Sequence, residues 1–432
     1  MPSSRHQPPV LSADEAMRLV ESGQRVYIHE AAMAPIELLE ALARRGPELH
    51  DVETVSMHTE GPAPHVDPSL VGHIRHNALF IGSNVREAVN EGRADYTPVF
   101  LSEIAGLMER GPLRPDVALI QVSPPDAHGF CRLGASIAVA RSAVDVAPTI
   151  IALVNPQTPV TLGNSAVHIS RFAAVVETDR PLPVHEQARI GPVERAIGEQ
   201  LSELIPDRST LQMGIGAIPD ATLACLTERE DLGIHTEMFS DGLVDLAEAG
   251  VITNRYKPTW RDRVVTSFAI GSQKVFEFID RNPFIEFHPT NIVNDTREIR
   301  KIDGMVAINS AIEIDLTGQI VADSIGTRFY SGIGGQIDFI RGARLARNGK
   351  AIIALPSTAK QGSVSRIVPE IAHGAGVVTT RGHVQYVATE HGVVNLDGRS
   401  IRQRAELLIS IAHPDHRAEL AAAGKHRHYS LS

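Results

Sequence analysis

The sequence predicts an α/β protein with two domains whose sheets are rich in parallel strands. The chain has 432 residues, more than one ordinary hydrophobic core holds, and this length favours two domains. The continuous apolar runs Val117–Val122 and Thr149–Val154 are typical of parallel strands buried on both faces. Strand patterns alternate with amphipathic helix patterns from the start of the chain, which is the rhythm of βα units.

The first 57 residues follow this rhythm. A capping box, Ser12-Ala13-Asp14-Glu15, predicts a helix over residues 13–22. Residues 25–29 alternate like a strand, and Pro35 stands at the start of a second apolar-striped helix. The chain therefore opens as a β-α succession.

Residues 58–76 interrupt the rhythm with a turn-rich segment. A loop of this length in a compact domain indicates a function more often than an idle connection. Its residues His65, Arg75 and His76 suggest the hypothesis of a site for a substrate with a second negative charge. The alternative is a solvated surface loop with incidental histidines.

Residues 79–82 read as a strand and residues 84–89 as a turn that enters a helix. The stiff turn at residues 124–129 separates the two apolar runs and carries Asp126 and His128. This pair suggests acid/base chemistry, but we favour a role in which both residues shape the loop by hydrogen bonding. Residues 180–184 are charged and punctuated by proline, so we place the domain boundary there, with domains 1–184 and 185–432.

The second domain is predicted to begin with a βαβα unit. A helix over residues 192–204 precedes a short strand at 210–213, a glycine turn at 214–218 and a helix at 219–227. The next strand pattern ends at Glu237, and Ser240-Asp241-Gly242 then signals a helix start. Loops that follow neighbouring parallel strands emerge at the same sheet edge, so the glycine turn and Glu237 are expected to be neighbours.

Glu237 is the candidate reactive group at this edge. It stands among Ile234, Met238 and Phe239, where a carboxylate would be poorly solvated and hence more nucleophilic than in water. The alternative is that Glu237 caps the following helix or pairs with a surface arginine.

The remainder of the chain continues the α/β pattern. Residues 264–270 read as a strand, residues 307–316 and 319–322 as a hairpin, and residues 332–335 as a second glycine-rich turn. Residues 351–355 read as a buried strand. The tail from residue 413 reads as a charged surface helix with a frayed end.

Composition narrows the function classes. A formal net charge of −10 argues against a nucleic-acid partner, which would need a basic face. Cys131 and Cys225 form neither a disulfide framework nor a metal-ligand spacing, so we expect core thiols and no metal. The N-terminus lacks an apolar signal segment, and no run approaches the ~20 apolar residues of a membrane span. We therefore expect a cytoplasmic protein without a membrane partner.

The glycine turns do not match common nucleotide or hydrolase motifs. The chain has no G-x-x-x-x-G-K phosphate loop and no G-x-G-x-x-G fingerprint at these turns. It also lacks a G-x-S-x-G elbow and an H-E-x-x-H pair, which argues against a serine esterase and a zinc protease. Glycine permits close approach and positive φ, so both turns can present main-chain N–H groups to a developing oxyanion.

Several segments together carry a resemblance to a known family. They are Gln121-Val122-Ser123-Pro124-Pro125-Asp126-Ala127-His128-Gly129, Gly214-Ile215-Gly216-Ala217-Ile218-Pro219-Asp220, His235-Thr236-Glu237-Met238-Phe239-Ser240-Asp241-Gly242, Val293-Asn294-Asp295, residues 308–315, residues 331–339, residues 356–360 and residues 411–414. In this order they resemble the acetyl-CoA hydrolase/transferase family of class I CoA-transferases. The resemblance implies the family's ribose-phosphate-isomerase-like fold, with CoA bound mainly to the second domain, and a homo-oligomer.

The resemblance also implies a site and a mechanism. The family's nucleophilic glutamate falls on Glu237, and an active-site amide falls on Asn294. Contacts to coenzyme A fall on a larger set: Gly214, Ile215, Gly216, Ala217, Ile218, Ala311, Gly335 and Lys360. Ile215 and Gly335 are the backbone oxyanion donors we favour. The implied chemistry is ping-pong transfer through a glutamyl-CoA thioester, with acyl-CoA as a substrate and no tightly bound cofactor.

Three functions stay open. The first is CoA transfer from an acyl-CoA to a small carboxylic acid, most like the 4-hydroxybutyrate CoA-transferase branch. Within it, residues 29–35 and 58–65 are similar to bacterial itaconate CoA-transferases that use succinyl-CoA. The second is a short-chain acyl-CoA hydrolase such as an acetyl-CoA hydrolase, in which water reaches the thioester. The third is a non-catalytic ligand-binding module, against which the intact Glu237 argues.

Overall fold

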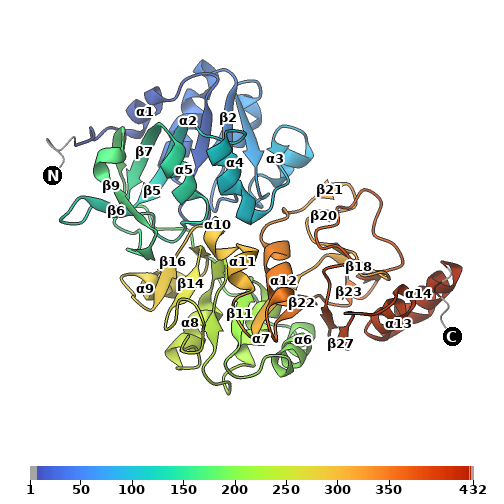
Figure 1. Ribbon diagram of the computed structural model, residues 1–432. Coiled ribbons are helices and arrows are strands. Elements are labelled where there is room, and N and C mark those ends of the chain that lie inside the picture. Colours follow the sequence, from blue (N-terminus) through green and yellow to red (C-terminus); the bar gives the residue numbers. More distant parts are fainter. Residues whose placement is uncertain (1–6, 428, 430–432) are drawn as a thin grey trace. The chain divides into compact units, whose positions relative to one another are not determined.

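The computed structural model describes residues 7–427 and 429, and its chain divides into two compact units (Figure 1). Unit 1 comprises residues 1–185 and 265–293, and unit 2 comprises residues 186–264 and 294–432. The N-terminal residues 1–6 and the chain end at 428 and 430–432, both subjects of sequence predictions, lie outside the described residues.

Unit 1 is built on a parallel sheet of seven strands with β1 (Arg25–Ile28) at its centre. On one side of β1 the order continues through β2, β3 and β4, and on the other through β5, β7 and β10. The bounds are β2 Val52–Ser56, β3 Ile74–Ala78, β4 Asp95–Tyr96, β5 Val117–Val122, β7 Thr149–Val154 and β10 Ala174–Glu177. Shorter strands lie outside this sheet: β6 Phe130–Arg132, β8 Leu162–Gly163, β9 Ala166–His168, β14 Val264–Thr266, β15 Phe268–Ala269 and β16 Ile285–Phe287.

Short helices cover this sheet. Their bounds are α1 Ala13–Ala16, α2 Ile36–Arg45, α3 Arg86–Asn90, α4 Ile104–Arg110, α5 Ala140–Val146, α9 Gln273–Ile279 and α10 Thr290–Val293. The apolar stripe of α2, with Leu38, Leu39 and Leu42, is fully buried against strands β1, β2, β5 and β7. The predicted capping box at Ser12 and Glu15 forms, but α1 passes into a 3-10 turn at Met17–Leu19.

The expected parallel α/β architecture is confirmed. The bounds of the apolar strands were predicted more accurately than those of the polar strand β3. The two apolar runs are β5 and β7, residue for residue. The strand predicted at residues 79–82 is wrong, because the strand there is β3, which ends at Ala78. Its sequence, Ile-Arg-His-Asn-Ala, has three polar residues in a row and therefore lacks the pattern of an interior strand.

Two of the three residues for which the sequence suggested a role in charge recognition are buried, and the third, Arg75, is exposed. His65 and His76 are fully buried, their ring centroids are 4.9 Å apart, and Nδ1 of His76 lies 3.0 Å from Oγ1 of Thr54. Burial lowers the pKa of His76 to about 4 and that of His65 well below its ordinary 6.5. Arg75 is paired with Asp95. The hypothesis that the two histidines attract a second negative charge is therefore wrong, because both are neutral core residues.

This burial predicts that acid weakens unit 1. A histidine whose pKa is lowered by folding contributes stability above its unfolded pKa of 6.5, and that contribution is lost progressively as the pH falls from 6.5 through about 4. Between pH 7 and pH 5, His76 alone should account for a loss of about 2 kcal/mol in the free energy of unfolding. His76→Asn should remove this part of the pH dependence, measured as urea unfolding midpoints at the two pH values.

The matched control for this experiment is His50→Asn. His50 is exposed, so its replacement should leave the difference between the two midpoints as it is in the natural protein. If His76→Asn showed the natural pH dependence, His76 would have to be protonated or solvated in the folded state, contrary to its burial.

Unit 2 contains a six-stranded sheet in the order β12, β11, β17, β22, β26, β27. All neighbours are parallel except β26 and β27. The bounds are β11 Thr210–Met213, β12 Gly233–Ile234, β17 Met305–Ser310, β22 Lys350–Ala354, β26 Tyr386–Thr389 and β27 Gly392–Asn395. Shorter strands are β13 Met238–Phe239, β18 Glu313–Asp315, β19 Ile320–Val321, β20 Ser324–Ile325, β21 Arg328–Phe329, β23 Thr358–Ala359, β24 Val364–Ser365 and β25 Ile367–Val368.

The sequence predicted the first three described helices of unit 2 and the last one, but not the three between them. Their bounds are α6 Pro192–Glu203, α7 Ala217–Ala224, α8 Asp241–Glu248, α11 Thr296–Ile299, α12 Gln336–Leu345, α13 Ile401–Ser410 and α14 Pro414–His426. Helix α12 packs on α11 and on strands β17 and β22. Figure 1 shows α11, α12 and β22 close together. The predicted hairpin is partly wrong: β18 and β19 pair antiparallel, but residues 305–310 before them are a separate central strand, β17.

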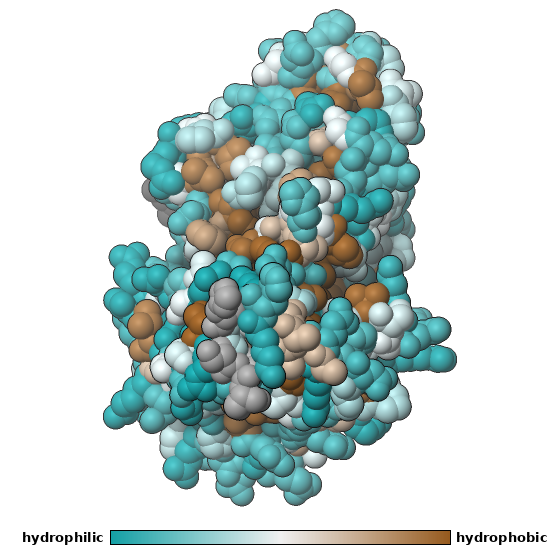
Figure 2. Space-filling model, turned by 90° about the vertical axis from the view of Figure 1, so that its right-hand side faces the viewer, coloured by the Kyte–Doolittle hydropathy of each residue, from teal (hydrophilic) through white to brown (hydrophobic). Residues whose placement is uncertain are grey.

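The face shown in Figure 2 is mostly hydrophilic, with hydrophobic areas between the hydrophilic residues. Apolar atoms make up a large part of the surface of most folded proteins, so scattered exposed apolar residues do not indicate a binding site. In the part of the chain that the structure describes, no helix has the length and apolarity needed to cross a membrane.

Candidate active site

The candidate site of unit 2 is built at the carboxyl ends of the neighbouring parallel strands β11 and β12. Thr210 pairs with Gly233 and Leu211 with Ile234, so both strands end at one edge of the sheet. The hydroxyl of Thr236 lies 3.1 Å from the carbonyl oxygens of Met213 and Met238. This hydroxyl joins the start of the first glycine turn to the backbone on either side of Glu237.

A loop after α8 fixes the strand that leads to Glu237. The ammonium of Lys257, 1 % exposed, donates to the carbonyl oxygens of Ile234 and Arg263, each at 2.7 Å. The side-chain carbonyl of Asn254 accepts from the N–H of Ile234 at 2.8 Å. Sequence reasoning missed these two residues, because their role depends on contacts over about 20 residues of chain that show no motif.

Glu237 follows β12 and is partly buried. Its Oε2 accepts a hydrogen bond from Nδ2 of Asn294 at 2.7 Å, and Asn294 itself is completely buried. Burial raises the pKa of Glu237 from 4.5 to about 7, although the bond from Asn294 opposes this rise. The carboxylate therefore has the reduced solvation that the sequence predicted and a protonation equilibrium near neutral pH.

The second glycine turn reaches the same carboxylate. Gly335 precedes the first residue of α12, and Gly334 before it has a φ of +61°. A Cβ built on Gly335 would overlap Oε2 of Glu237 and stand against Nδ2 of Asn294. Three residues chosen from the sequence, Glu237, Asn294 and Gly335, are thus brought together, and the backbone at Gly335 approaches the carboxylate in a way that only glycine allows.

The first glycine turn, Gly214 to Ile218, leaves β11 and leads into α7. Gly216 has a φ of +113°, while Ile215 is 42 % exposed. Ala217 and Ile218 are already the first residues of the helix, which therefore begins two residues before the predicted start at Pro219. Thr236, the residue before Glu237, donates to the carbonyl of Met213, the residue before this turn. The turn and Glu237 therefore each begin one residue from this hydrogen bond.

Ala311 and Lys360 lie in different settings. Ala311 is buried directly after β17, and Gln336, the residue after Gly335, donates from Nε2 to the carbonyl of Ser310 at 2.8 Å. Lys360 is exposed on the turn between β23 and β24, with a φ of +49°. Among the residues that the structure describes, no hydrogen bond or ion pair joins Lys360 to Glu237, Asn294 or Gly335.

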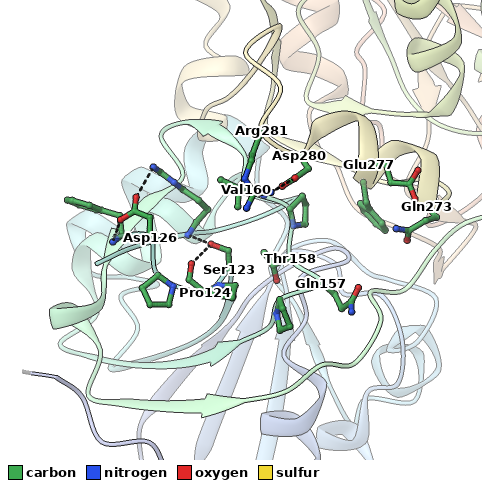
Figure 3. Close-up of a pocket in the computed structure, with 16 residues that line it drawn as sticks. Ser123, Pro124, Asp126, Gln157, Thr158, Val160, Gln273, Glu277, Asp280 and Arg281 are labelled. Carbon is green, nitrogen blue, oxygen red and sulfur yellow. Dashed lines mark hydrogen bonds and ion pairs between the residues drawn. The ribbon is translucent and has the colours of Figure 1, made fainter. Parts of the chain in front are cut away.

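A large cavity of about 620 Å³ lies in unit 1, outside the carboxyl ends of β5 and β7 (Figure 3). Ser123 and Asp126 stand on one side, and Gln273 and Glu277 on the other. Oδ1 of Asp126 accepts from the N–H groups of His128 and Phe130, so the predicted loop-shaping role of Asp126 is confirmed. None of the residues predicted to react or to bind CoA lines this cavity, so the size of this cavity does not point to Glu237.

One further acidic residue belongs to the Glu237 group and was missed. Oδ2 of Asp338, in the first turn of α12, lies 3.4 Å from Nδ2 of Asn294. The signal was present in the sequence, since Asp338 stands three residues after Gly335 within a matched segment. Within the described ranges, no group of three or more His, Cys, Asp or Glu side chains has the arrangement of a metal site.

Comparisons with known proteins support the family resemblance found in the sequence. Family profiles described as the acetyl-CoA hydrolase/transferase N-terminal and C-terminal domains match residues 3–186 and 271–423. The chain is 45 % identical over 418 residues to the 4-hydroxybutyrate coenzyme A transferase of Clostridium kluyveri, covering 97 % of both chains. It is 47 % identical to the succinyl-CoA:acetate/propanoyl-CoA:succinate CoA transferase of Fasciola hepatica, covering 95 % of this chain and 87 % of that one.

A solved structure agrees as well. The crystal structure of RipA from Yersinia pestis matches with a TM-score of 0.92 and 35 % identity over 98 % of each chain. Two domain profiles and relatives of nearly full length lead to the same assignment, which the motifs around Glu237 and Gly335 had suggested. The chain belongs to the acetyl-CoA hydrolase/transferase family.

Proposed function

We propose that the protein transfers coenzyme A from an acyl-CoA, succinyl-CoA by preference, to a small carboxylic acid such as itaconate or 4-hydroxybutyrate. The observation that carries this proposal is the group formed by Glu237, Asn294 and Gly335. A partly desolvated carboxylate that receives one amide hydrogen bond and faces a glycine backbone is suited to attack a thioester.

The proposed reaction proceeds through covalent stages on Glu237. A carboxylate oxygen attacks the thioester carbonyl carbon, the C–S bond breaks, and an acyl-glutamyl anhydride and CoA thiolate form. The thiolate then attacks the glutamyl carbonyl, which releases the donor's acid and leaves a glutamyl-CoA thioester. An incoming carboxylate repeats these two steps in reverse and leaves as the new acyl-CoA, so Glu237 is regenerated.

The chain's own residues have distinct parts in this scheme. Asn294 donates to the Glu237 oxygen, which stabilises the carboxylate before attack and polarises the glutamyl carbonyl afterwards. N–H groups at Ile215 and Gly335 are the proposed oxyanion donors. Gly214 to Ile218, Ala311 and Lys360 are the proposed contacts of CoA, for which Lys360 supplies an exposed positive charge suited to a phosphate.

The names of the relatives support the choice of substrates to different extents. Relatives with 45 % and 47 % identity are named for 4-hydroxybutyrate and for succinyl-CoA with acetate or propanoyl-CoA. Both names describe exchange of CoA between an acyl-CoA and a carboxylate. The choice of itaconate as an acceptor rests on the similarity of residues 29–35 and 58–65 to itaconate CoA-transferases. A homo-oligomer in the cytoplasm stays a prediction.

The test is a panel of carboxylates, each assayed with succinyl-CoA, acetyl-CoA and butyryl-CoA as donors. We expect new acyl-CoA to form with parallel-line kinetics, fastest for succinyl-CoA with itaconate or 4-hydroxybutyrate. Free CoA released at the same rate without an acceptor acid would establish a hydrolase instead. CoA binding with neither product would leave a binding module and would contradict the proposal.

A further inference from the structure

We propose that Asp338 is a positioning residue that keeps the N–H side of the Asn294 amide turned toward Glu237. This inference rests on the proposed function for its catalytic meaning. Its structural basis is one nitrogen atom, Nδ2 of Asn294, which donates to Oε2 of Glu237 at 2.7 Å and lies 3.4 Å from Oδ2 of Asp338.

An asparagine amide has no intrinsic preference between its two ends. The nitrogen and oxygen differ little in size, and a half-turn about the last bond exchanges two donors for an acceptor. The orientation of Asn294 is therefore set by what surrounds it. The two N–H bonds of Nδ2 can serve one carboxylate each, and Asp338 supplies the second acceptor.

The other end of the amide does not oppose this orientation. Oδ1 of Asn294 is buried and has no hydrogen-bond partner among the described residues. A turned amide would bring Oδ1 toward two acceptor groups and lose both hydrogen bonds. Since Asn294 and Asp338 are both buried, at 0 % and 5 % exposure, water cannot readily replace those bonds.

Asp338 becomes more important as the reaction proceeds. When Glu237 is acylated, it loses its negative charge and with it much of its attraction for an N–H group. Asp338 takes no part in the covalent steps and remains an acceptor for the amide throughout. It can thus hold the donor in place for the glutamyl carbonyl at the stage when Glu237 no longer does so.

A simpler role for Asp338 has to be separated from this one. Asp338 is in the first turn of the ten-residue helix α12, where a negative charge favours the helix. In that role it would support the fold, and its charge would also raise the pKa of the neighbouring Glu237 carboxyl. Loss of the Asp338 charge would lower the pKa of Glu237, whereas loss of the hydrogen bond from Asn294 would raise it. The direction in which this pKa moves provides the test.

The experiment replaces Asp338 with Asn and measures transfer kinetics over pH. An amide at 338 offers a donor as well as an acceptor, so it no longer favours one end of the Asn294 amide. The turned orientation, which lacks the hydrogen bond to Glu237, is then populated. We expect kcat to fall at least ~10-fold with KM for acyl-CoA within about twofold. We also expect the acid limb of the kcat profile, which reports ionisation of Glu237, to move to higher pH by about one unit.

Three results would overturn the inference. Movement of the acid limb to lower pH would show that Asp338 acts through its charge alone. An unchanged limb with a lower unfolding temperature would show a purely structural role. The control for the latter is Asp315→Asn, since Asp315 is a buried carboxylate of unit 2 that accepts from Thr317 and Gln319 within its own turn. This control should lower the unfolding temperature and leave the pH profile unchanged, and an identical effect of both variants would also contradict the inference.

A readout without turnover separates this inference from the proposed function. Infrared difference spectra between each protein and its Glu237→Gln variant report the protonation of the Glu237 carboxyl directly. The midpoint should lie higher with Asn at 338 than with Asp. If the enzyme transferred no CoA but the midpoint rose, the proposed function would fail and the positioning role would stand; a midpoint that did not rise would reject the positioning role whatever the activity.

Discussion

Glu237→Ala is expected to lower CoA transfer by at least about 10⁴-fold, the scale seen when a covalent nucleophile is removed. Without this carboxylate no acyl-glutamyl anhydride can form, and Asn294 and Gly335 have no group to act on. The fold should persist, since Glu237 lies between two-residue strands and is only partly buried. Steady-state transfer and far-UV circular dichroism measure the two effects.

Chemical trapping of the proposed glutamyl-CoA thioester tests the role of Glu237 in a second way. Borohydride reduces a thioester to an alcohol, so treatment with acyl-CoA and then borohydride should inactivate the natural protein permanently. Borohydride alone should not. The modified peptide should contain Glu237, as mass spectrometry can show, and Glu237→Ala should yield no such peptide.

The pH dependence of stability tests the burial of Glu237 independently of its activity. Folding raises the pKa of Glu237 to about 7, so its contribution to stability is present below its ordinary value of 4.5 and is lost as the pH rises through about 7. At pH 8 the ionised side chain should cost about 1–3 kcal/mol, a range that allows for its partial exposure. Glu237→Gln should therefore resist urea better than the natural protein at pH 8, without this advantage at pH 5.

The matched control is Glu228→Ala, which removes an exposed carboxylate nine positions earlier in the chain. It should leave both transfer and the pH dependence of stability unchanged. Substantial transfer by Glu237→Ala would reject Glu237 as the nucleophile. Equal stability of Glu237→Gln and the natural protein at both pH values would show that the carboxyl is solvated and would remove the physical reason for its reactivity.

The parts of the fold that sequence predicted well are those where one physical effect dominates. Val117–Val122 and Thr149–Val154 are strands with the predicted bounds, because a strand buried on both faces is apolar along most of its length. Thr210–Met213 also has the predicted bounds, although Thr210 and Gln212 are polar. Strand β3 was missed because Arg75, His76 and Asn77 satisfy their polar groups through particular partners. Such partners come from distant parts of the chain and leave no periodicity in the sequence.

The site shows the same division. Strand-end position and a motif resemblance singled out Glu237, Asn294 and Gly335, and the geometry brings them together, while their chemical roles stay predictions. Lys257 was not foreseen, because a lysine normally lies at the surface and its burial is visible only once Ile234 and Arg263 surround it. Sequence thus identifies the proposed site residues more readily than the residues that hold them in place.

Gly335→Ala is expected to lower transfer by about 10²–10³-fold with little loss of stability. The added Cβ would occupy the space of Oε2 of Glu237 and press on Nδ2 of Asn294. Both atoms are the ends of side chains that can turn aside, and the φ of −97° at Gly335 suits alanine. The displacement therefore moves the proposed nucleophile and its amide donor out of their present positions and leaves the backbone undisturbed.

The control for this variant reverses the pattern. Gly342 lies in the same helix, α12, but a Cβ there would come within 2.5 Å of Cγ2 of Ile299 in the packed contact with α11. Gly342→Ala should lower the unfolding temperature and leave kcat unchanged in the protein that remains folded. Unfolding temperature and kcat measured together distinguish the two variants, because close approach at Gly335 serves the carboxylate and close approach at Gly342 serves helix packing. If Gly335→Ala transferred CoA at the natural rate, Glu237 would have to react from a position that does not need the glycine, and the geometry proposed for the attack would be wrong.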